Sequence, residues 1–487
     1  MFVPDEESAR WIESLAAAAA PQLAVGLWPG WDPSAVPVGI VLPGAAGLCV
    51  LRPREPGGRE VASRDGGPLP GVRFLTWAEA RASGLPVTPG TPPRLRGLAG
   101  PDGTTVTVRG AGGPAVFVET PGPLPGRPDL AGAVHGALFA LWFAARGGPA
   151  PAPGGAPDAD VPEDAALRAV EGRLMGALLR EVPGGGLLRH ATALALVRRE
   201  RRAAAPEETV ALEQAREASD GLPAYVAARC AEAAGGVAAL EALAAALGEL
   251  AEAAPGAGAR LSGWGLAACL DRVEAEAPES PSSARPWAAR ADLSGGWKAA
   301  LASGAVADLD AAFEARLRFD GGSRDDALLR QAKEAHGHDD ALSAARRRAE
   351  TAAHARNTLL QRILRGAGTL VAVDVGALPA PRVDADAPPE AIHAGMAVYA
   401  RGASFRYAGG TIVEFRGLPL AEDRRSGLLQ TRIAARLAFA GDGARMAPGG
   451  ETAFESGLDL ELPGLRVHAR AGSIRPIDGG YLIRLLR

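Results

Sequence analysis

The chain has 487 residues, enough for about three domains of ordinary size, and its 47% hydrophobic and 22% charged residues are typical of a globular protein. A formal net charge of −4 argues against a protein that coats polyanions or binds nucleic acid in general. The three cysteines (Cys49, Cys230 and Cys269) are too few and too far apart for a disulfide framework, so each is expected to be a buried free thiol.

The first 125 residues are predicted to form an N-terminal region with a small, mostly antiparallel sheet. A helix is expected over residues 7–20, ending before Pro21. Short β-type runs broken by Pro and Gly follow from residue 27, and the clearest of them cover residues 36–42, 47–51, 105–108 and 115–118.

A dense apolar helix is predicted over residues 130–145, with Asp129 as its N-cap. Because this helix is apolar around its whole circumference, it is expected to be central and largely buried. It is shorter than the roughly 20 residues that a membrane span needs. The N-terminus shows no basic segment followed by a long apolar run, so no signal peptide is predicted. A soluble, cytoplasmic protein without membrane contact is expected.

The rest of the chain is predicted to form a helical body over residues 126–366 and an all-β domain over residues 367–487, which makes the fold class α+β. A Gly/Pro-rich segment at 147–157 is typical of a linker. The C-terminal strands are expected near residues 369–375, 396–400, 411–415, 458–462 and 481–486, with hairpin turns at 409–410 and 479–480.

His135 is the most unusual polar residue, because it lies inside the most apolar helix. A histidine there must be buried, so it needs a partner or stays neutral. About 80 residues later, Glu213, Glu217 and Asp220 follow at i, i+4 and i+7, which places them on one face of a helix. A solvated acidic face is the simplest interpretation of these three carboxylates. The chain contains no Gly-x-Ser-x-Gly elbow and no Walker A loop.

The order of several segments resembles that of gluzincin-type zinc metallopeptidases. Val134–Phe139 stands where that family carries His-Glu-x-x-His, and Ser219–Tyr225 resembles its Asn-Glu-Gly-Leu-Ala-x-Tyr segment, whose Glu is the third zinc ligand. The resemblance also includes residues 28–33 near the N-terminal sheet and a later helical stretch with residues 262–263, 270–272 and 297–298.

The departures from the family pattern determine the predicted function. The family holds zinc with two His and the distal Glu, and uses the Glu after the first His as general base. Here the base position is Gly136 and the second ligand position is Phe139, so at most His135 and Asp220 remain. The resemblance therefore implies a pseudopeptidase, a scaffold that has lost zinc and hydrolysis and whose groove binds a peptide or protein. No cofactor is expected; a bound zinc would have His135, Glu217 and Asp220 as ligands.

Two alternatives stay open at this stage. One is an active hydrolase with a rebuilt, carboxylate-rich metal site made from His135, Glu213, Glu217 and Asp220, which would suit Mn²⁺ or Mg²⁺ better than Zn²⁺. The other is an assembly protein that binds through its C-terminal β domain. Without a metal, His135 is expected to hydrogen-bond Asp220 or Glu217, and restoring Gly136→Glu with Phe139→His is expected to raise zinc affinity.

Overall fold

A computed structural model gives the structure of the chain, and it describes residues 1–486 with internal gaps. The boundary predicted between residues 125 and 126 and most of the predicted linker lie outside the described residues. The gaps are 42–46, 53–57, 84, 86–95, 100–104, 111–113, 119–126, 149–160, 183–184, 237–239, 254, 277–295, 318, 320–321, 385–389, 394, 435–451 and 455–456.

The chain has an α+β fold and divides into two compact units. Unit 1 comprises residues 1–157 and 163–342, and unit 2 comprises residues 158–162 and 343–487. Three parts were expected, but one hydrophobic core runs from Ile12 in the first helix to Phe313 in the helical body. The N-terminal sheet and the helical body therefore belong to a single unit.

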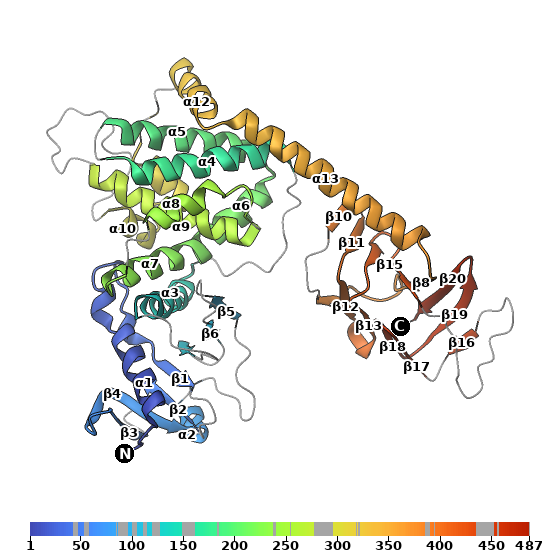
Figure 1. Cartoon of the computed structure of the whole chain (residues 1–487), viewed down its shortest axis with the longest axis horizontal. Coiled ribbons are helices and arrows are strands. Elements are labelled where there is room, and N and C mark those ends of the chain that lie inside the picture. The colour runs from blue at the N-terminus through green and yellow to red at the C-terminus, as the bar shows by residue number, and fades with distance from the viewer. Residues whose placement is uncertain are drawn as a thin grey trace. The chain divides into compact units, whose positions relative to one another are not determined.

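The N-terminal sheet has seven strands in the order β3-β4-β2-β1-β7-β6-β5 (Figure 1). All its pairings are antiparallel except β1 with β7, so the prediction of a mostly antiparallel sheet is confirmed. The strands are β1 (Val38–Val41), β2 (Gly47–Leu51), β3 (Arg59–Ala62), β4 (Pro68–Thr76), β5 (Arg96–Ala99), β6 (Thr105–Gly110) and β7 (Pro114–Val118).

Helices make up most of unit 1. They are α1 (Glu6–Ala18), α2 (Trp77–Ala82), α3 (Arg127–Ala145), α4 (Pro162–Arg180), α5 (Gly185–Ala203), α6 (Glu207–Arg216), α7 (Leu222–Ala233), α8 (Leu240–Gly248), α9 (Pro255–Glu276), α10 (Gly296–Ser303), α11 (Leu309–Glu314) and α12 (Ser323–Ala335). Three shorter turns are η1 (Pro21–Ala24), η2 (Pro33–Ala35) and the π-helical turn η3 (Glu217–Gly221).

Helix α3 lies between α7 and the N-terminal elements, as Figure 1 shows, and contacts α1, β6 and β7 as well. It begins at Arg127, so Asp129 lies in its first turn and is not the N-cap that the sequence predicted. Its residues are almost all buried from Leu130 to Phe139, whereas Ala144 and Ala145 are exposed. By length and composition α3 is the one described helix that could cross a membrane, but half of that window is buried in the structure, as in a core helix.

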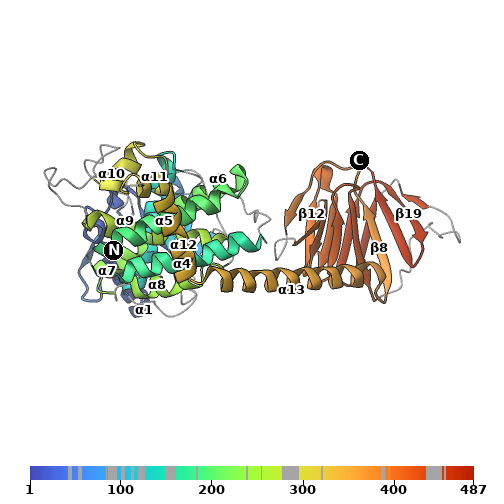
Figure 2. The same ribbon diagram turned by 90° about the horizontal axis from the view of Figure 1, so that it is seen from above.

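Unit 2 contains an eight-stranded sheet in the order β10-β11-β14-β15-β8-β20-β19-β16 and a five-stranded sheet in the order β17-β18-β13-β12-β9. Figure 2 shows β8, β12 and β19 as part of one strand-rich unit. Its elements are α13 (His338–Arg365), which begins in unit 1, β8 (Thr369–Asp374), β9 (Arg382–Asp384), β10 (Glu390–His393), β11 (Met396–Tyr399), β12 (Gly402–Arg406), η4 (Ala408–Gly410), β13 (Ile412–Arg416), β14 (Leu420–Asp423), β15 (Leu428–Ile433), β16 (Thr452–Phe454), β17 (Leu458–Leu462), β18 (Leu465–Ala469), β19 (Gly472–Ile477) and β20 (Gly480–Leu485).

The predicted hairpin at Gly409 and Gly410 is confirmed. Both residues have positive φ, 83° and 87°, and they join β12 to its antiparallel neighbour β13. Glycine adopts this left-handed conformation without the steric cost that other residues incur.

Candidate functional site

His135 is fully buried in α3, with a relative exposure of 0%. Its imidazole meets the Trp31 ring edge-on, with 6.2 Å between ring centroids, and neither ring nitrogen has a hydrogen-bond partner among the residues that the structure describes. Burial lowers the pKa of His135 to about 4; the Arg52 guanidinium lowers it further, while backbone groups of Ala18 and Ala20 act in the opposite direction. His135 is therefore neutral at pH 7.

The expected hydrogen bond between His135 and Asp220 or Glu217 is wrong. The Glu217 carboxylate accepts hydrogen bonds from arginines instead, and the Asp220 carboxylate accepts one from the Ser219 hydroxyl at 3.2 Å. Burial raises the pKa of Asp220, opposed by the bond from Ser219.

Because the pKa of His135 is lowered, unit 1 is expected to lose stability in acid. Its pKa is about 4 in the folded chain and about 6.5 when unfolded, so the unfolded chain binds the additional proton between these values. Stability is then lost as the pH falls from 6.5 towards 4, by up to about 3 kcal/mol. In His135→Leu, the free energy of unfolding is expected to fall less between pH 6.5 and pH 4. Urea unfolding at these two pH values measures the difference. An equal loss of unfolding free energy in His135→Leu and in the natural chain would show that His135 is not the source of the acid sensitivity.

Gly136, at the position of the family's general base, lies where α3 closely approaches α7. A Cβ atom at this position would come within 3.0 Å of both the Ala227 Cβ atom and the Pro223 carbonyl oxygen. At Gly132, one turn earlier, a Cβ atom would come within 2.8 Å of the Ala227 carbonyl oxygen. The absence of side chains at these two positions lets the helices pack backbone to backbone.

Phe139, at the position of the second zinc ligand, is fully buried in an aromatic cluster. Its ring centroid lies 4.9 Å from that of Trp28, 5.2 Å from that of Trp31, 5.6 Å from that of Trp142 and 5.7 Å from that of Phe143. Phe139 thus fills its position with apolar volume.

The acidic residues of the second segment are carried by α6 and the π-helical turn η3. Glu213 belongs to α6, and Glu217 begins η3. The backbone of η3 lies against α9: a Cβ atom on Gly221 would come within 2.6 Å of the Gly263 Cα atom, and one on Gly263 within 2.2 Å of the Glu217 carbonyl oxygen. This close approach places Glu217 beside the α9 residue Ser262, whose hydroxyl donates to it at 2.5 Å.

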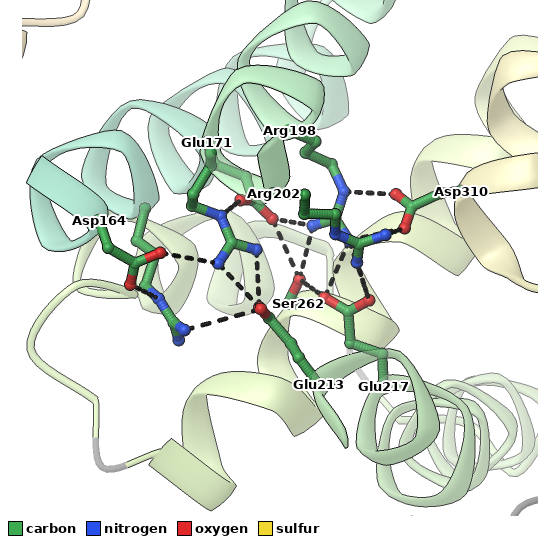
Figure 3. Close-up of polar contacts among 10 residues, drawn as sticks. Asp164, Glu171, Arg198, Arg202, Glu213, Glu217, Ser262 and Asp310 are labelled. Atoms are coloured by element: carbon green, nitrogen blue, oxygen red, sulfur yellow. Dashed lines mark hydrogen bonds and ion pairs between the residues drawn. The ribbon is translucent and has the colours of Figure 1, made fainter. Parts of the chain in front are cut away.

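Three arginines of α5 meet these carboxylates in a buried ionic network (Figure 3). Arg198, Arg201 and Arg202 stand at i, i+3 and i+4, so they share one face of the helix. The other members of the network are Asp164, Arg168, Glu171, Glu213, Glu217, Ser262 and Asp310.

Arg198 is the centre of the network and is only 2% exposed. Its guanidinium donates to both Glu217 carboxylate oxygens at 2.9 Å, to Asp310 at 2.6 Å and to the Ser262 hydroxyl at 3.0 Å, and it also pairs with Glu171. Every one of its nitrogens therefore has an acceptor, which compensates for the cost of burying the charge.

Arg201 forms an ion pair with Glu213, the first of the three predicted acidic residues. Its guanidinium donates to the two Glu213 oxygens at 2.7 and 2.9 Å, to Glu171 at 3.0 Å and to Asp164 at 3.3 Å. Burial by itself would raise the pKa of Glu213, but the charges of Arg201 and Arg168 outweigh it and lower the value to about 2. The interpretation of Glu213 and Glu217 as a solvated acidic face was wrong, because both are neutralised inside the protein.

Among the described residues, no three His, Cys, Asp or Glu side chains are grouped closely enough to hold a metal ion. This includes His135, Glu213, Glu217 and Asp220, so the carboxylate-rich metal site considered above is not formed in this structure. The physical reason is that the arginines of α5 engage Glu213 and Glu217, while His135 lies against Trp31.

The arginines of α5, Glu171 and Asp310 were not predicted from the sequence as site residues. A signal was present: basic residues at i, i+3 and i+4 in an otherwise Leu- and Ala-rich helix complement the carboxylates of Glu213 and Glu217, four residues apart. Sequence spacing cannot show, however, that these two helical faces meet.

The later stretch of the resemblance forms a second polar cluster around Asp271 in α9. Its carboxylate accepts hydrogen bonds from the Tyr225 hydroxyl at 2.5 Å and the Trp297 indole at 3.0 Å, and the Lys298 ammonium lies 3.3 Å away. Burial and the Asp271 charge raise the pKa of Tyr225. The structure thus brings Tyr225 of the third-ligand-like segment together with Asp271, Trp297 and Lys298 of the later stretch.

Comparison of the chain with protein-family models, curated proteins and solved structures found no match.

Proposed function

We propose that this chain is a metallopeptidase-like protein without peptidase activity, and that it acts as a scaffold for a peptide or protein. One observation carries the proposal. The two positions where gluzincin peptidases place the general base and the second zinc ligand hold Gly136 and Phe139, and packing requirements account for both residues.

The packing of α3 supports the scaffold part of the proposal. Helix α3 packs along α7, whose first residues, Leu222–Tyr225, belong to the segment that resembles the third-ligand motif, and it also contacts η3. The two segments that would form a zinc site in the family are therefore neighbours in space, although their side chains serve other purposes. Figure 3 shows the carboxylates of Glu213 in α6 and Glu217 in η3 bound to arginines of the buried ionic network.

We also propose that the chain works in the cytoplasm, without nucleic acid or membrane as a partner. Cys49, Cys230 and Cys269 are all buried free thiols, which suits a reducing compartment. Helix α3 packs against α7 and the N-terminal elements, as a core helix does.

A peptidase assay tests the proposal. The full chain, supplied with zinc, is expected to hydrolyse labelled casein no faster than His135→Ala, because loss of a general base alone costs on the order of 10²–10⁴ in rate. Zinc-dependent hydrolysis that disappears in His135→Ala would contradict the proposal.

A further inference from the structure

A hollow of about 480 Å³ lies in unit 1 between α4, α8 and the turn that joins α12 to α13. Small residues make its floor. A Cβ atom on Gly176 would come within 2.9 Å of the Ala244 carbonyl oxygen, so α4 and α8 approach closely beneath it. The floor residues are Gly176, Ala177, Ala244, Ala245, Gly248 and Ala335.

Two arginines are the charged residues that line this hollow, and no carboxylate lines it among the described residues. Arg173 is held in place, because its guanidinium donates to the His336 carbonyl oxygen at 2.5 Å. Arg180 is exposed, and its guanidinium makes no hydrogen bond or ion pair to another described residue. The hollow is therefore cationic in a chain whose net charge is −4.

The spacing of these arginines points to the form of the ligand. Arg173, Gly176, Ala177 and Arg180 stand at i, i+3, i+4 and i+7 of α4, so the arginines flank the small residues on one helix face. Seven residues rise about 10.5 Å along a helix. A partner helix with two carboxylates seven residues apart repeats this spacing.

We propose that this hollow binds an acidic helical segment of a partner protein. Two carboxylates of the segment pair with Arg173 and Arg180, and its small residues pack on the floor between them. Arginine forms strong, directional pairs with carboxylates, and small residues on both surfaces let helix backbones approach closely. The proposal deepens the proposed function and rests on it, because it names the class of partner that the scaffold takes.

Fluorescence anisotropy with a designed peptide tests the proposal on the full chain. The probe is a labelled, alanine-rich helical peptide of about 16 residues with two Glu seven positions apart, and the control peptide has Gln at both positions. The Glu peptide is expected to bind at least about tenfold more tightly, and Arg180→Ala is expected to lose about tenfold in affinity. Arg330→Ala removes another exposed arginine of the same unit and is expected to leave binding unchanged.

Reversing the charge at position 180 distinguishes a direct ion pair with the peptide from an indirect effect of Arg180→Ala. Arg180→Glu is expected to reject the Glu peptide and to bind a peptide in which one Glu is replaced by Lys.

Equal binding of the Glu and Gln peptides, or an equal loss of affinity in Arg180→Ala and Arg330→Ala, would overturn the proposal. Displacement of the peptide by inorganic phosphate, but not by sodium chloride of equal ionic strength, would assign the hollow to phosphate and overturn it as well. Each of these results leaves the scaffold proposal standing, whereas hydrolysis of casein would overturn the scaffold proposal itself.

Discussion

Replacing Arg198 with leucine is expected to lower the free energy of unfolding of unit 1 by about 3–5 kcal/mol. The substitution removes the shared partner of Glu171, Glu217 and Asp310. Glu171 and Glu217 are 0% and 1% exposed, so water cannot solvate the charges that lose this guanidinium. Breaking a buried ion pair from one side costs far more than the pair contributes in net terms, because an uncompensated charge stays behind.

Urea unfolding followed by tryptophan fluorescence measures this loss in unit 1 alone, since all eight tryptophans lie within residues 1–342. Arg199→Leu is the matched control. Arg199 is the next residue of α5 and pairs with Glu314 at the surface, so its loss is expected to cost no more than about 1 kcal/mol. Equal losses in the two variants would contradict the importance given to the buried network.

Gly136→Glu is expected to destabilise unit 1 by about 4 kcal/mol or more, or to prevent its folding. The new side chain would begin 3.0 Å from the Ala227 Cβ atom and the Pro223 carbonyl oxygen, so α3 and α7 would have to separate. It would also bring a carboxylate into an interface that has no room to hydrate it. The same steric conflict would act against the expected gain in zinc affinity of Gly136→Glu with Phe139→His.

The matched control for this prediction is Ala144→Glu, at an exposed position of the same helix. A surface substitution of this kind is expected to change stability by no more than about 0.5 kcal/mol. The measurement is again urea unfolding with tryptophan fluorescence. A Gly136→Glu chain as stable as Ala144→Glu would show that the gap between α3 and α7 is wider than described.

Much of the fold was predictable because it depends on local patterns. The strands at β1, β2, β6 and β7 follow from short β-branched runs between Pro and Gly, and α3 follows from its length and apolar composition. The start of α3 was misplaced by three residues, because an Asp in the first turn of a helix looks much like an N-cap in sequence.

The candidate site was less predictable, because its partners are distant in sequence. The positions of Glu213 and Glu217 on one face were foreseen, but Arg198 lies 19 residues from Glu217 and 112 from Asp310. Nothing local indicates that these segments meet. For His135, the sequence left two outcomes, a polar partner or a neutral buried ring, and tertiary packing against Trp31 produced the second.

Zinc content tests the central claim most directly, namely that the residues at the metal-site positions serve packing. The full chain is purified without chelators, loaded with zinc, freed of excess metal and analysed for zinc per chain, with His135→Ala treated in parallel. We predict far less than one zinc per chain, with no difference between the two proteins. Close to one zinc per chain in the natural protein, lost in His135→Ala, would contradict the account.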